Sequence, residues 1–446
     1  MNFEEASKVL VAAAKAEGLS EYEIYYMQGE SMSAETLKDE ISSFSNSVGG
    51  GISFRCISNG KMGYASSELF EKDEMVSLVK RAMSNAANMD GDDVPEIFAG
   101  SPSYEKTSHK PPRDISAAEL KDAALKLQRR TYAESEYVTD GTQSGAVVSK
   151  VDVALSNSYG LELRNTLGMC GSYVQAVVNR EGEAEDEFEF CEGIEGEEYD
   201  SVSNKTVNGA LKKLGAAEVE SGKYDIIFSG KTMKSMLSTF SSVFSGKNAY
   251  EGLSLLAGKV GERIAADCIT IVDDPMREGS AMQTSFDGEG VATYKKNVIQ
   301  NGVLKTLLYD LATAKKVGAA STGNGHRSSY TSPVSISPYN FYIKGGEKTL
   351  AELMAGVERG IYITELKGLH AGANAVTGDF SIESAGFIIE NGELGAAVKS
   401  FTVAGNFFDL LISIENISDN VDFSIPSLTA FGSPDVLVRE MSVAGK

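Results

Sequence analysis

The sequence contains few of the side chains that usually carry out hydrolytic or metal chemistry. It has three histidines in 446 residues, and none of His109, His326 and His370 has another histidine three to five positions away. Zinc peptidases commonly take two ligands from one helical face, as in HExxH, so this spacing does not support a zinc site. No GxSxG elbow is present, and a serine or cysteine nucleophile needs a positioned base. The residues alone therefore indicate no catalytic centre.

Cysteines and long apolar runs are also scarce. The four cysteines are far apart and form no CxxC pair, which predicts reduced, buried thiols in a cytoplasmic protein: Cys56, Cys170, Cys191 and Cys268. No run of about 18 apolar residues occurs, so we expect no membrane-spanning helix. The N-terminus lacks a basic region before its apolar residues and is not expected to be a secretory signal.

Basic residues are fewer than acidic residues in this chain. Acidic residues outnumber basic ones by 63 to 41, which gives a net charge of −22. A surface that negative repels phosphate backbones, and no dense cluster of Lys and Arg offsets the repulsion. We therefore expect no direct contact with nucleic acid. The hydrophobic fraction of 42% is sufficient for folded cores.

The patterns that are present predict an α+β protein in three units. We expect two smaller N-terminal α/β units, at 1–90 and 113–220, and a larger β-rich C-terminal domain at 221–446 with a few helices. Residues 91–112 lose periodicity, hold four prolines and are predicted to be a linker that contains a solvated His109. Helices are expected at 3–17, 71–88, 115–130, 203–217 and 349–360. Asn-Gly pairs predict hairpins, because both positions tolerate positive φ, at 59–60, 301–302 and 391–392.

Two local patterns suggest chemistry but favour structural interpretations. Ser-Gly-Lys-Thr at 229–232 follows a strand-like run, as in a P-loop, but Asp225 stands where a P-loop needs a glycine. The acidic stretch 181–200 could suggest a cation site. Its phenylalanines and glutamates alternate over 187–190, however, as expected for a strand with one solvated face. Glycine-rich loops such as 317–333 can instead border a cleft that accepts an extended peptide.

Several longer segments, in order along nearly the whole chain, resemble the TldD/PmbA family. This family is associated with metal-dependent peptide processing and was once described as modulators of DNA gyrase. The similar segments are GISFRCISNGKMGYASS (51–67), STGNGHRSSY (321–330), GIYITELKGLHAGANAVTGDFSIESAGFIIENGEL (360–394) and FTVAGN (401–406). Together and in this order they are more specific than any one of them.

The resemblance also implies which kind of family member this chain is. TldD-type chains carry HExxxH on a helix near the start of the C-terminal domain, with a later cysteine that completes a zinc site. PmbA-type chains, also called TldE, lack this motif and pair with TldD-type chains in the cytoplasm. The matching segment here, 224–244, contains no histidine and no glutamate, and Cys268 does not match the ligand cysteine. The resemblance therefore implies a non-catalytic PmbA-type subunit with no metal or cofactor of its own, whose TldD-type partner supplies the zinc.

The same resemblance points to candidate substrate contacts. In the family, the loop and strand that match 368–381 line a cleft between subunits where a substrate peptide would lie. This makes Asn324, Arg327, His370 and Asn374 candidate contacts to an unfolded or leader peptide. Two alternatives stay open. One is a homodimeric peptide-binding or regulatory protein without proteolytic activity, and the other is a metallopeptidase with a rearranged site of His326, His370 and a carboxylate.

Overall fold

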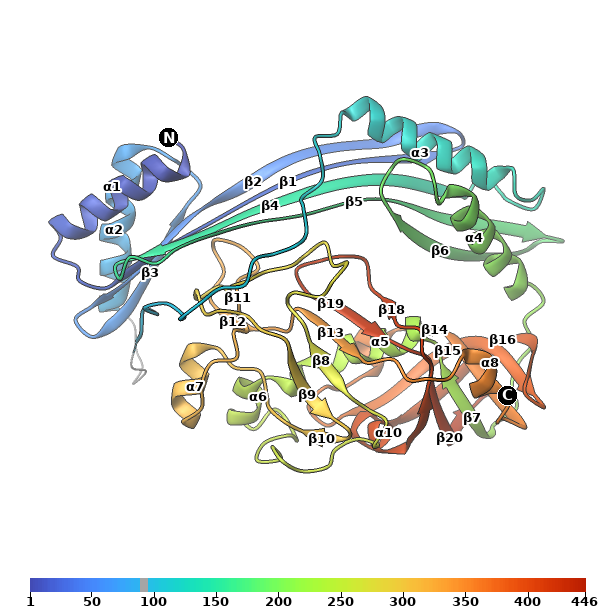
Figure 1. The fold of residues 1–446 in the computed structure, drawn as a ribbon. Coiled ribbons are helices and arrows are strands. Elements are labelled where there is room, and N and C mark those ends of the chain that lie inside the picture. Colours follow the sequence, from blue (N-terminus) through green and yellow to red (C-terminus); the bar gives the residue numbers. More distant parts are fainter. Residues whose placement is uncertain (89–94) are drawn as a thin grey trace.

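The computed structural model of the chain describes residues 1–88 and 95–446. The last two residues of the first predicted unit and the first four of the predicted linker lie outside the described residues. An arched N-terminal sheet spans a separate β-rich C-terminal lobe (Figure 1). The predicted α+β class with a β-rich C-terminal part is confirmed.

One antiparallel sheet unites the two N-terminal units. Its strand order is β3–β2–β1–β4–β5–β6, and β1 pairs with β2 on one side and with β4 on the other. Backbone hydrogen bonds therefore join the two units directly, which the sequence did not predict. The strands are β1 (Tyr22–Leu37), β2 (Glu40–Ser58), β3 (Lys61–Ser67), β4 (Gln143–Asn157), β5 (Glu162–Arg180) and β6 (Glu183–Glu192).

Helices cover this sheet at its two ends. α1 (Phe3–Ala16) and α2 (Lys72–Ala87) pack at the β3 end, where apolar residues at helical spacing form a buried core. α3 (Ala117–Tyr132) and α4 (Tyr199–Lys213) lie on the convex face toward β6 (Figure 1). The opposite, concave face of the sheet looks toward the C-terminal lobe. No helix among the described residues has both the length and the apolar character needed to span a bilayer.

The C-terminal lobe contains two six-stranded sheets and one two-stranded sheet. The first sheet has the order β16–β15–β14–β7–β20–β17, and an extra pairing of β16 with β20 closes five of its strands into a ring. The second has the order β10–β9–β8–β13–β19–β18. Their strands are β7 (Gly222–Phe228), β8 (Ile271–Asp273), β9 (Lys296–Gln300), β10 (Val303–Leu304), β13 (Asn340–Ile343), β14 (Arg359–Lys367), β15 (Asp379–Glu390), β16 (Glu393–Asn406), β17 (Ile414–Ile417), β18 (Asp422–Phe423), β19 (Ala430–Ser433) and β20 (Val436–Ala444). β11 (Gly325–His326) and β12 (Ser335–Ile336) form the small sheet.

One large apolar core runs through this lobe, beside a smaller cluster under α8 (Leu350–Met354). Phe240 of α5 (Gly230–Phe240) stacks on Phe407, with ring centroids 4.5 Å apart, and both side chains are fully buried. The core joins α5 and strands of both six-stranded sheets. The remaining helical segments of the lobe are η1 (Ser241–Phe244), α6 (Gly246–Tyr250), α7 (Leu311–Val317), α8 (Leu350–Met354), α9 (Leu369–Gly372) and α10 (Phe407–Ser413).

The sequence predicted the hairpin turns correctly but misplaced the end of one helix. All three predicted Asn-Gly hairpins are confirmed, with positive φ at Asn59, Asn301 and Asn391 and at the glycine that follows each. The helix predicted at 349–360 begins as expected, with a capping box between Thr349 and Glu352, but it ends at Met354. The prediction that this helix ends at Gly360 is therefore wrong. Gly360 lies in β14 opposite Asp225, where a Cβ atom would be 2.5 Å from the Asp225 carbonyl oxygen.

The described part of the linker, residues 95–112, runs between the sheet and the C-terminal lobe without regular secondary structure (Figure 1). Its backbone is held by the Gln283 side chain, whose Oε1 accepts hydrogen bonds from the backbone N–H groups of Ser108 (2.7 Å) and His109 (3.0 Å). The His109 ring is also hydrogen-bonded to the Gly168 carbonyl at 2.9 Å. The prediction of a solvated His109 is therefore wrong, because the linker packs between the two lobes.

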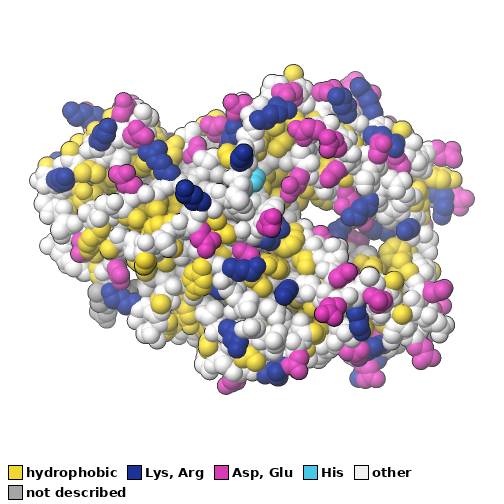
Figure 2. Space-filling model, viewed as in Figure 1, with side chains coloured by type: hydrophobic (Ala, Val, Ile, Leu, Met, Phe, Trp, Pro, Cys, Tyr) yellow, Lys and Arg dark blue, Asp and Glu magenta, His cyan; other side chains and the backbone are white. Residues whose placement is uncertain are grey.

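Charged side chains of both signs gather where the β6 end of the sheet meets the C-terminal lobe (Figure 2). Glutamates of the acidic stretch pair with lysines there. Lys399 contacts Glu183 and Glu185 at 3.0 Å, and Glu187 pairs with both Lys213 and Lys231. These glutamates thus contribute to an ion-pair contact between the lobes rather than to a purely solvated face.

Replacing Glu187 by glutamine is expected to reduce stability in a pH-dependent way. Burial alone would raise the pKa of the Glu187 carboxyl, but the nearby Lys231 and Lys213 outweigh burial and lower it. A lowered native pKa stabilises the fold above the unfolded pKa, and this stabilisation is lost as pH falls through the native pKa. We expect Glu187→Gln to cost about 1–2 kcal/mol near pH 7 and progressively less as the pH falls toward 3.

Urea unfolding of the two proteins across this pH range measures the difference. Glu192→Gln, at an exposed position of the same strand, is the matched control and should change little at any pH. A cost for Glu187→Gln that stays constant down to acid pH would contradict a role for the ionised carboxylate.

Candidate functional site

A cleft of about 430 Å³ opens between the β2–β3 end of the arched sheet and the loops around α7 and β12. Lys61, Met62 and Tyr64 reach it from β3, the edge strand of the sheet. The loop that follows β11 approaches the sheet closely here. A Cβ atom on Gly51 would lie 2.5 Å from the Tyr330 ring, so only glycine permits this contact.

The floor of the cleft is a buried network of ion pairs that joins the lobes. Glu23 of β1 is fully buried, and its two carboxylate oxygens accept hydrogen bonds from Arg327 at 2.6 Å and from Arg55 at 2.8 Å. A second carboxylate, Glu289, lies 3.7 Å from Arg55. Both arginines line the cleft, and both are less than a tenth exposed. One carboxylate therefore pairs with two guanidinium groups, one from each lobe.

The neighbouring carboxyl groups resist ionisation. Burial and the nearby Glu289 raise the pKa of Asp287 to about 8, although three backbone N–H groups donate hydrogen bonds to its carboxyl. Burial also raises the pKa of Glu289, against the lowering effect of Arg55. Burial therefore disfavours the ionised form of both carboxyl groups that lie beside the arginines.

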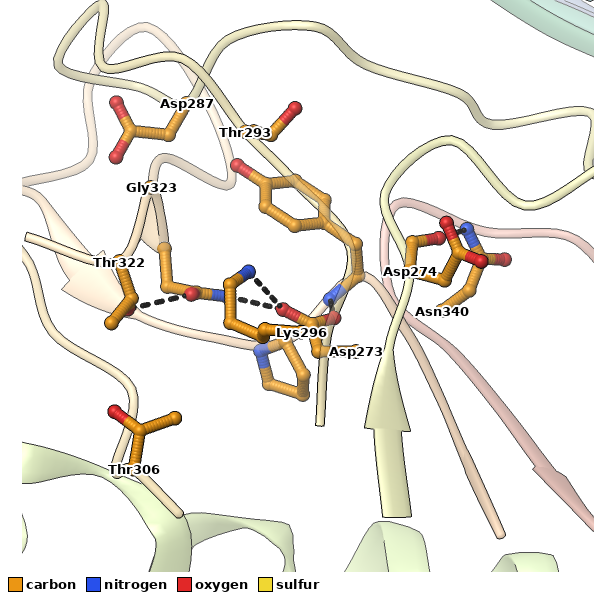
Figure 3. A network of polar contacts seen from close by, with 12 residues as sticks. Asp273, Asp274, Asp287, Thr293, Lys296, Thr306, Thr322, Gly323 and Asn340 are labelled. Carbon is orange, nitrogen blue, oxygen red and sulfur yellow. Dashed lines mark hydrogen bonds and ion pairs between the residues drawn. The ribbon is translucent and has the colours of Figure 1, made fainter. Parts of the chain in front are cut away.

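A second buried network is centred on Asp273, at the end of β8, and includes Lys296 (Figure 3). Asn324 belongs to this network. Asp273 Oδ2 accepts hydrogen bonds from Lys296 at 3.0 Å and from the Asn324 side chain at 2.8 Å, while Oδ1 accepts from the Tyr339 backbone N–H at 2.8 Å. The Asn324 amide oxygen accepts from Thr322. Asn324 is fully buried and fixes the 322–337 loops rather than facing a cleft.

The four predicted substrate contacts fall in different parts of the lobe. Arg327 lines the cleft and Asn324 lies in the Asp273 network, as described above. His370 is exposed on α9, and Asn374 lies in the turn that follows, where its side-chain oxygen accepts hydrogen bonds from the backbone of Val376 and Thr377. This bonding gives Asn374 a turn-forming role, and contact of any of the four with a peptide stays a prediction.

The two histidines of the rearranged metal site lie on separate elements. His326 is on β11, and its Nε2 is buried without a hydrogen-bond partner in the described part of the chain. Burial lowers the pKa of His326, which favours the neutral ring. His370 is on α9, and among the described residues no group of three or more His, Cys, Asp or Glu side chains is arranged to hold a metal ion. The structure thus gives no support to that alternative.

The segment that the resemblance matches to the zinc motif of TldD-type chains, 224–244, contains most of β7 and all of α5. α5 is capped by Ser229 and packs its apolar face into the core through Met233, Met236, Leu237 and Phe240. It has no imidazole or carboxylate, so its residues do not fit a zinc site. In the P-loop-like sequence, the Lys231 side chain forms an ion pair with Glu187, and the Thr232 hydroxyl donates a hydrogen bond to the Ser229 carbonyl. This bonding agrees with the rejection of a phosphate site.

Sequence reasoning missed the residues that build the cleft floor. Glu23 and Arg55 each stand between buried apolar neighbours within a strand, at positions 22–24 and 54–56. A charge in such a setting is rarely buried unless it is paired. In the sequence this alternation predicts a strand with one solvated face, so no local signal marks either residue or names Arg327 as the third partner.

These features define a two-lobed α+β protein whose lobes are tied by buried ion pairs beside a cleft. Models of three PmbA/TldA metallopeptidase domains match the chain in order: domain 1 at residues 22–86, the central domain at 110–214 and the C-terminal domain at 221–445. The chain therefore belongs to the PmbA/TldA metallopeptidase family, and the resemblance found in the sequence is confirmed.

Related proteins share most of its length. A metalloprotease of Methanothermobacter thermautotrophicus is 27% identical over 425 residues, which cover 89% of this chain and 89% of that protein. The metalloprotease PmbA of Escherichia coli O157:H7 is 25% identical over 344 residues, which cover 75% and 72% of the two chains.

Solved structures share the whole fold. The crystal structure of a Thermotoga maritima protein described as a modulator of a DNA gyrase has a TM-score of 0.89 at 28% identity, and the match covers 99% of this chain and 100% of that one. TldE from Thermococcus kodakarensis has the same fold, with a TM-score of 0.87 at 24% identity and the same coverage.

Proposed function

We propose that this chain is the non-catalytic, PmbA/TldE-type subunit of a cytoplasmic TldD–TldE metallopeptidase complex. The observation that carries the proposal is α5. The helix at the place of the family's zinc motif buries Met233, Met236 and Phe240 and offers no metal ligand or base. The zinc-activated water would come from the TldD-type partner, which carries HExxxH.

In this complex the chain would complete the chamber that holds the substrate. Unfolded or leader peptides are the substrates that we propose, because an extended chain can bind a sheet edge through its main chain with little dependence on sequence. The edge strand β3 beside the large cleft is one such position. The four cysteines are free thiols, which agrees with the reducing cytoplasm.

The test is a cleavage assay with the full chain, an unstructured peptide and a co-purified TldD-type protein. We expect no cleavage by this chain alone, cleavage by the mixture, and loss of cleavage when a chelator removes the metal. A partner variant that lacks the first histidine of HExxxH is the matched control and should be inactive in the same complex.

Two outcomes would count against the proposal. Chelator-sensitive cleavage by the purified chain alone would place a metal site within it. Failure to associate with any TldD-type protein, together with binding of peptides that are never cleaved, would instead favour the homodimeric peptide-binding protein.

A further inference from the structure

The N-terminal sheet has one long edge that no strand covers. β3 pairs with β2 only over Ile52–Ser58, so residues 41–51 pair with β1 on one side and with no other strand in the described part of the chain (Figure 1). We call residues 41–51 the free β2 edge, and residues 42–49 of it are all exposed. Free backbone N–H and C=O groups on an exposed edge are a template for pairing with another chain.

The two edges of this sheet differ in their protection against such pairing. The opposite edge strand, β6, carries six acidic residues between Glu183 and Glu192, and three of its glutamates form ion pairs with lysines of the C-terminal lobe. Residues 41–54 of β2 include no charged residue and no proline. Because charges and prolines are the usual means of preventing edge pairing, this contrast indicates that the free β2 edge is paired in the assembled protein.

The hairpin between β2 and β3 determines which backbone groups face outward. Ser58 and Lys61 close a two-residue turn, and such a closing pair exchanges both backbone hydrogen bonds. Alternate residues of an antiparallel strand bond to opposite neighbours, so the even-numbered residues of β2 bond away from β1. The register with β1 is unbroken over 43–56. The same alternation therefore directs the N–H and C=O groups of three residues to the free β2 edge: Phe44, Asn46 and Val48.

The side chains of these three residues are arranged symmetrically. Phe44 and Val48 lie two positions before and after Asn46, and they are 39% and 65% exposed. All three share the face of the sheet that carries α3, whose Lys121 ammonium lies 4.4 Å from the centre of the Phe44 ring. The other face of the edge carries only small side chains, which leave room for a neighbouring strand: Ser43, Ser45, Ser47 and Gly49.

We propose that the free β2 edge pairs antiparallel with the same edge of a second copy of this chain, about a two-fold axis at Asn46. This register places Phe44 of each copy opposite Val48 of the other, and Asn46 opposite Asn46. An aromatic residue opposite a β-branched one is a stabilising cross-strand pair, and no like charges stand opposite each other.

The symmetry of the edge favours a second copy over an unrelated strand. A two-fold axis at residue 46 sets 41–51 against 51–41, so the whole free segment is used and stops where β3 begins to cover β2. Such self-complementarity is what an isologous interface requires, whereas an unrelated peptide does not need it. The two N-terminal sheets then form one continuous sheet.

Sedimentation equilibrium of the purified full-length chain tests the proposal. Strand pairing gives a small interface, so we expect the mass to rise from monomer toward dimer between about 1 and 100 µM. Asn46→Lys sets two ammonium groups opposite each other at the axis and should raise the dissociation constant about five-fold or more. Ser84→Lys, at an exposed position of α2, makes the same change of charge away from the edge and should leave the dimer unchanged.

A monomer throughout this range would overturn the proposal. A dimer that Asn46→Lys and Ser84→Lys affect equally would overturn the free β2 edge as its interface.

A single cysteine tests the register. A hydrogen-bonded antiparallel pair has Cα atoms about 5.5 Å apart, within reach of a disulfide, so Asn46→Cys should form a covalent dimer under oxidising conditions. Ser43→Cys is the matched control, because the axis places it six positions, roughly 20 Å, from its counterpart. The native cysteines are the same in both variants. Equal cross-linking on non-reducing electrophoresis would overturn the register.

The inference goes beyond the proposed function and can fail separately from it. Self-association is measured without a partner or a peptide, whereas the proposed function is tested by cleavage in a mixture. A chain that is monomeric alone, but loses its TldD-type partner in Asn46→Lys, would overturn the second copy as the occupant and assign the free β2 edge to that partner.

Discussion

Replacing Asp273 by asparagine is expected to lower the free energy of unfolding by about 3–5 kcal/mol, the usual cost of breaking a buried ion pair by removing one partner. Asp273 is fully buried, and the side chain of Lys296 is 4% exposed. The substitution leaves the Lys296 ammonium without its counterion and turns an amide donor toward the Asn324 donor. Urea unfolding, followed by far-UV circular dichroism, measures the loss.

A second substitution separates the charge effect from simple loss of packing. The double variant with Lys296→Met also removes the stranded ammonium, and we expect it to recover a large part of the lost stability. Asp122→Asn, which breaks an exposed Asp122–Lys126 pair on α3, is the control and should cost less than about 1 kcal/mol. A double variant less stable than Asp273→Asn alone would contradict this explanation.

Replacing Glu23 by glutamine is expected to have an effect of similar size, about 3–5 kcal/mol, because two buried arginines then lose their shared carboxylate. The loss should concentrate at the contact between the lobes, since Glu23 lies in the N-terminal sheet and Arg327 in the C-terminal lobe. Urea unfolding gives the total cost. Hydrogen exchange of the amides in β1 and in the 325–330 loop locates it.

The salt dependence of the stability lost in Glu23→Gln tests whether the network is buried. Buried pairs are poorly screened, so the cost of Glu23→Gln should be almost the same in low and high salt. Glu30→Gln, at an exposed position of the same strand β1, is the matched control and should change stability by less than about 0.5 kcal/mol. A cost for Glu23→Gln that disappears in high salt would contradict a buried network.

The two variants also affect different networks. Glu23 joins the two arginines that line the cleft, whereas Asp273 supports the neighbouring loops that carry Asn324 and Tyr339. Both networks tie together segments that are far apart in the chain, so their loss should unfold tertiary contacts rather than single helices.

The candidate site could be predicted from the sequence only in part. The family resemblance pointed to Arg327 and Asn324, which lie in the conspicuous segment 321–330. It could not assign their roles, because the partners Glu23 and Asp273 are 304 and 51 residues away along the chain. His370 and Asn374 were named from the same resemblance, yet the fold places them on and after α9, in a separate part of the lobe.

By itself the sequence determined the features that depend on neighbouring residues. The helices at the ends of the sheet follow from apolar spacing of 3.6 residues, and the hairpin turns follow from the tolerance of Asn-Gly for positive φ. The absence of His and Glu from 224–244 is likewise a property of the chain alone.

Only the tertiary structure decided which distant segments meet. It joined two expected units into one sheet through β1 and β4, placed glutamates of an acidic strand against lysines of another lobe, and gathered Glu23, Arg55 and Arg327 beneath one cleft. Such contacts depend on how whole sheets pack, and a local pattern carries no information about the partner across the interface. The buried charges are stable because both lobes supply opposite signs at the same point, and that coincidence exists only in the folded chain.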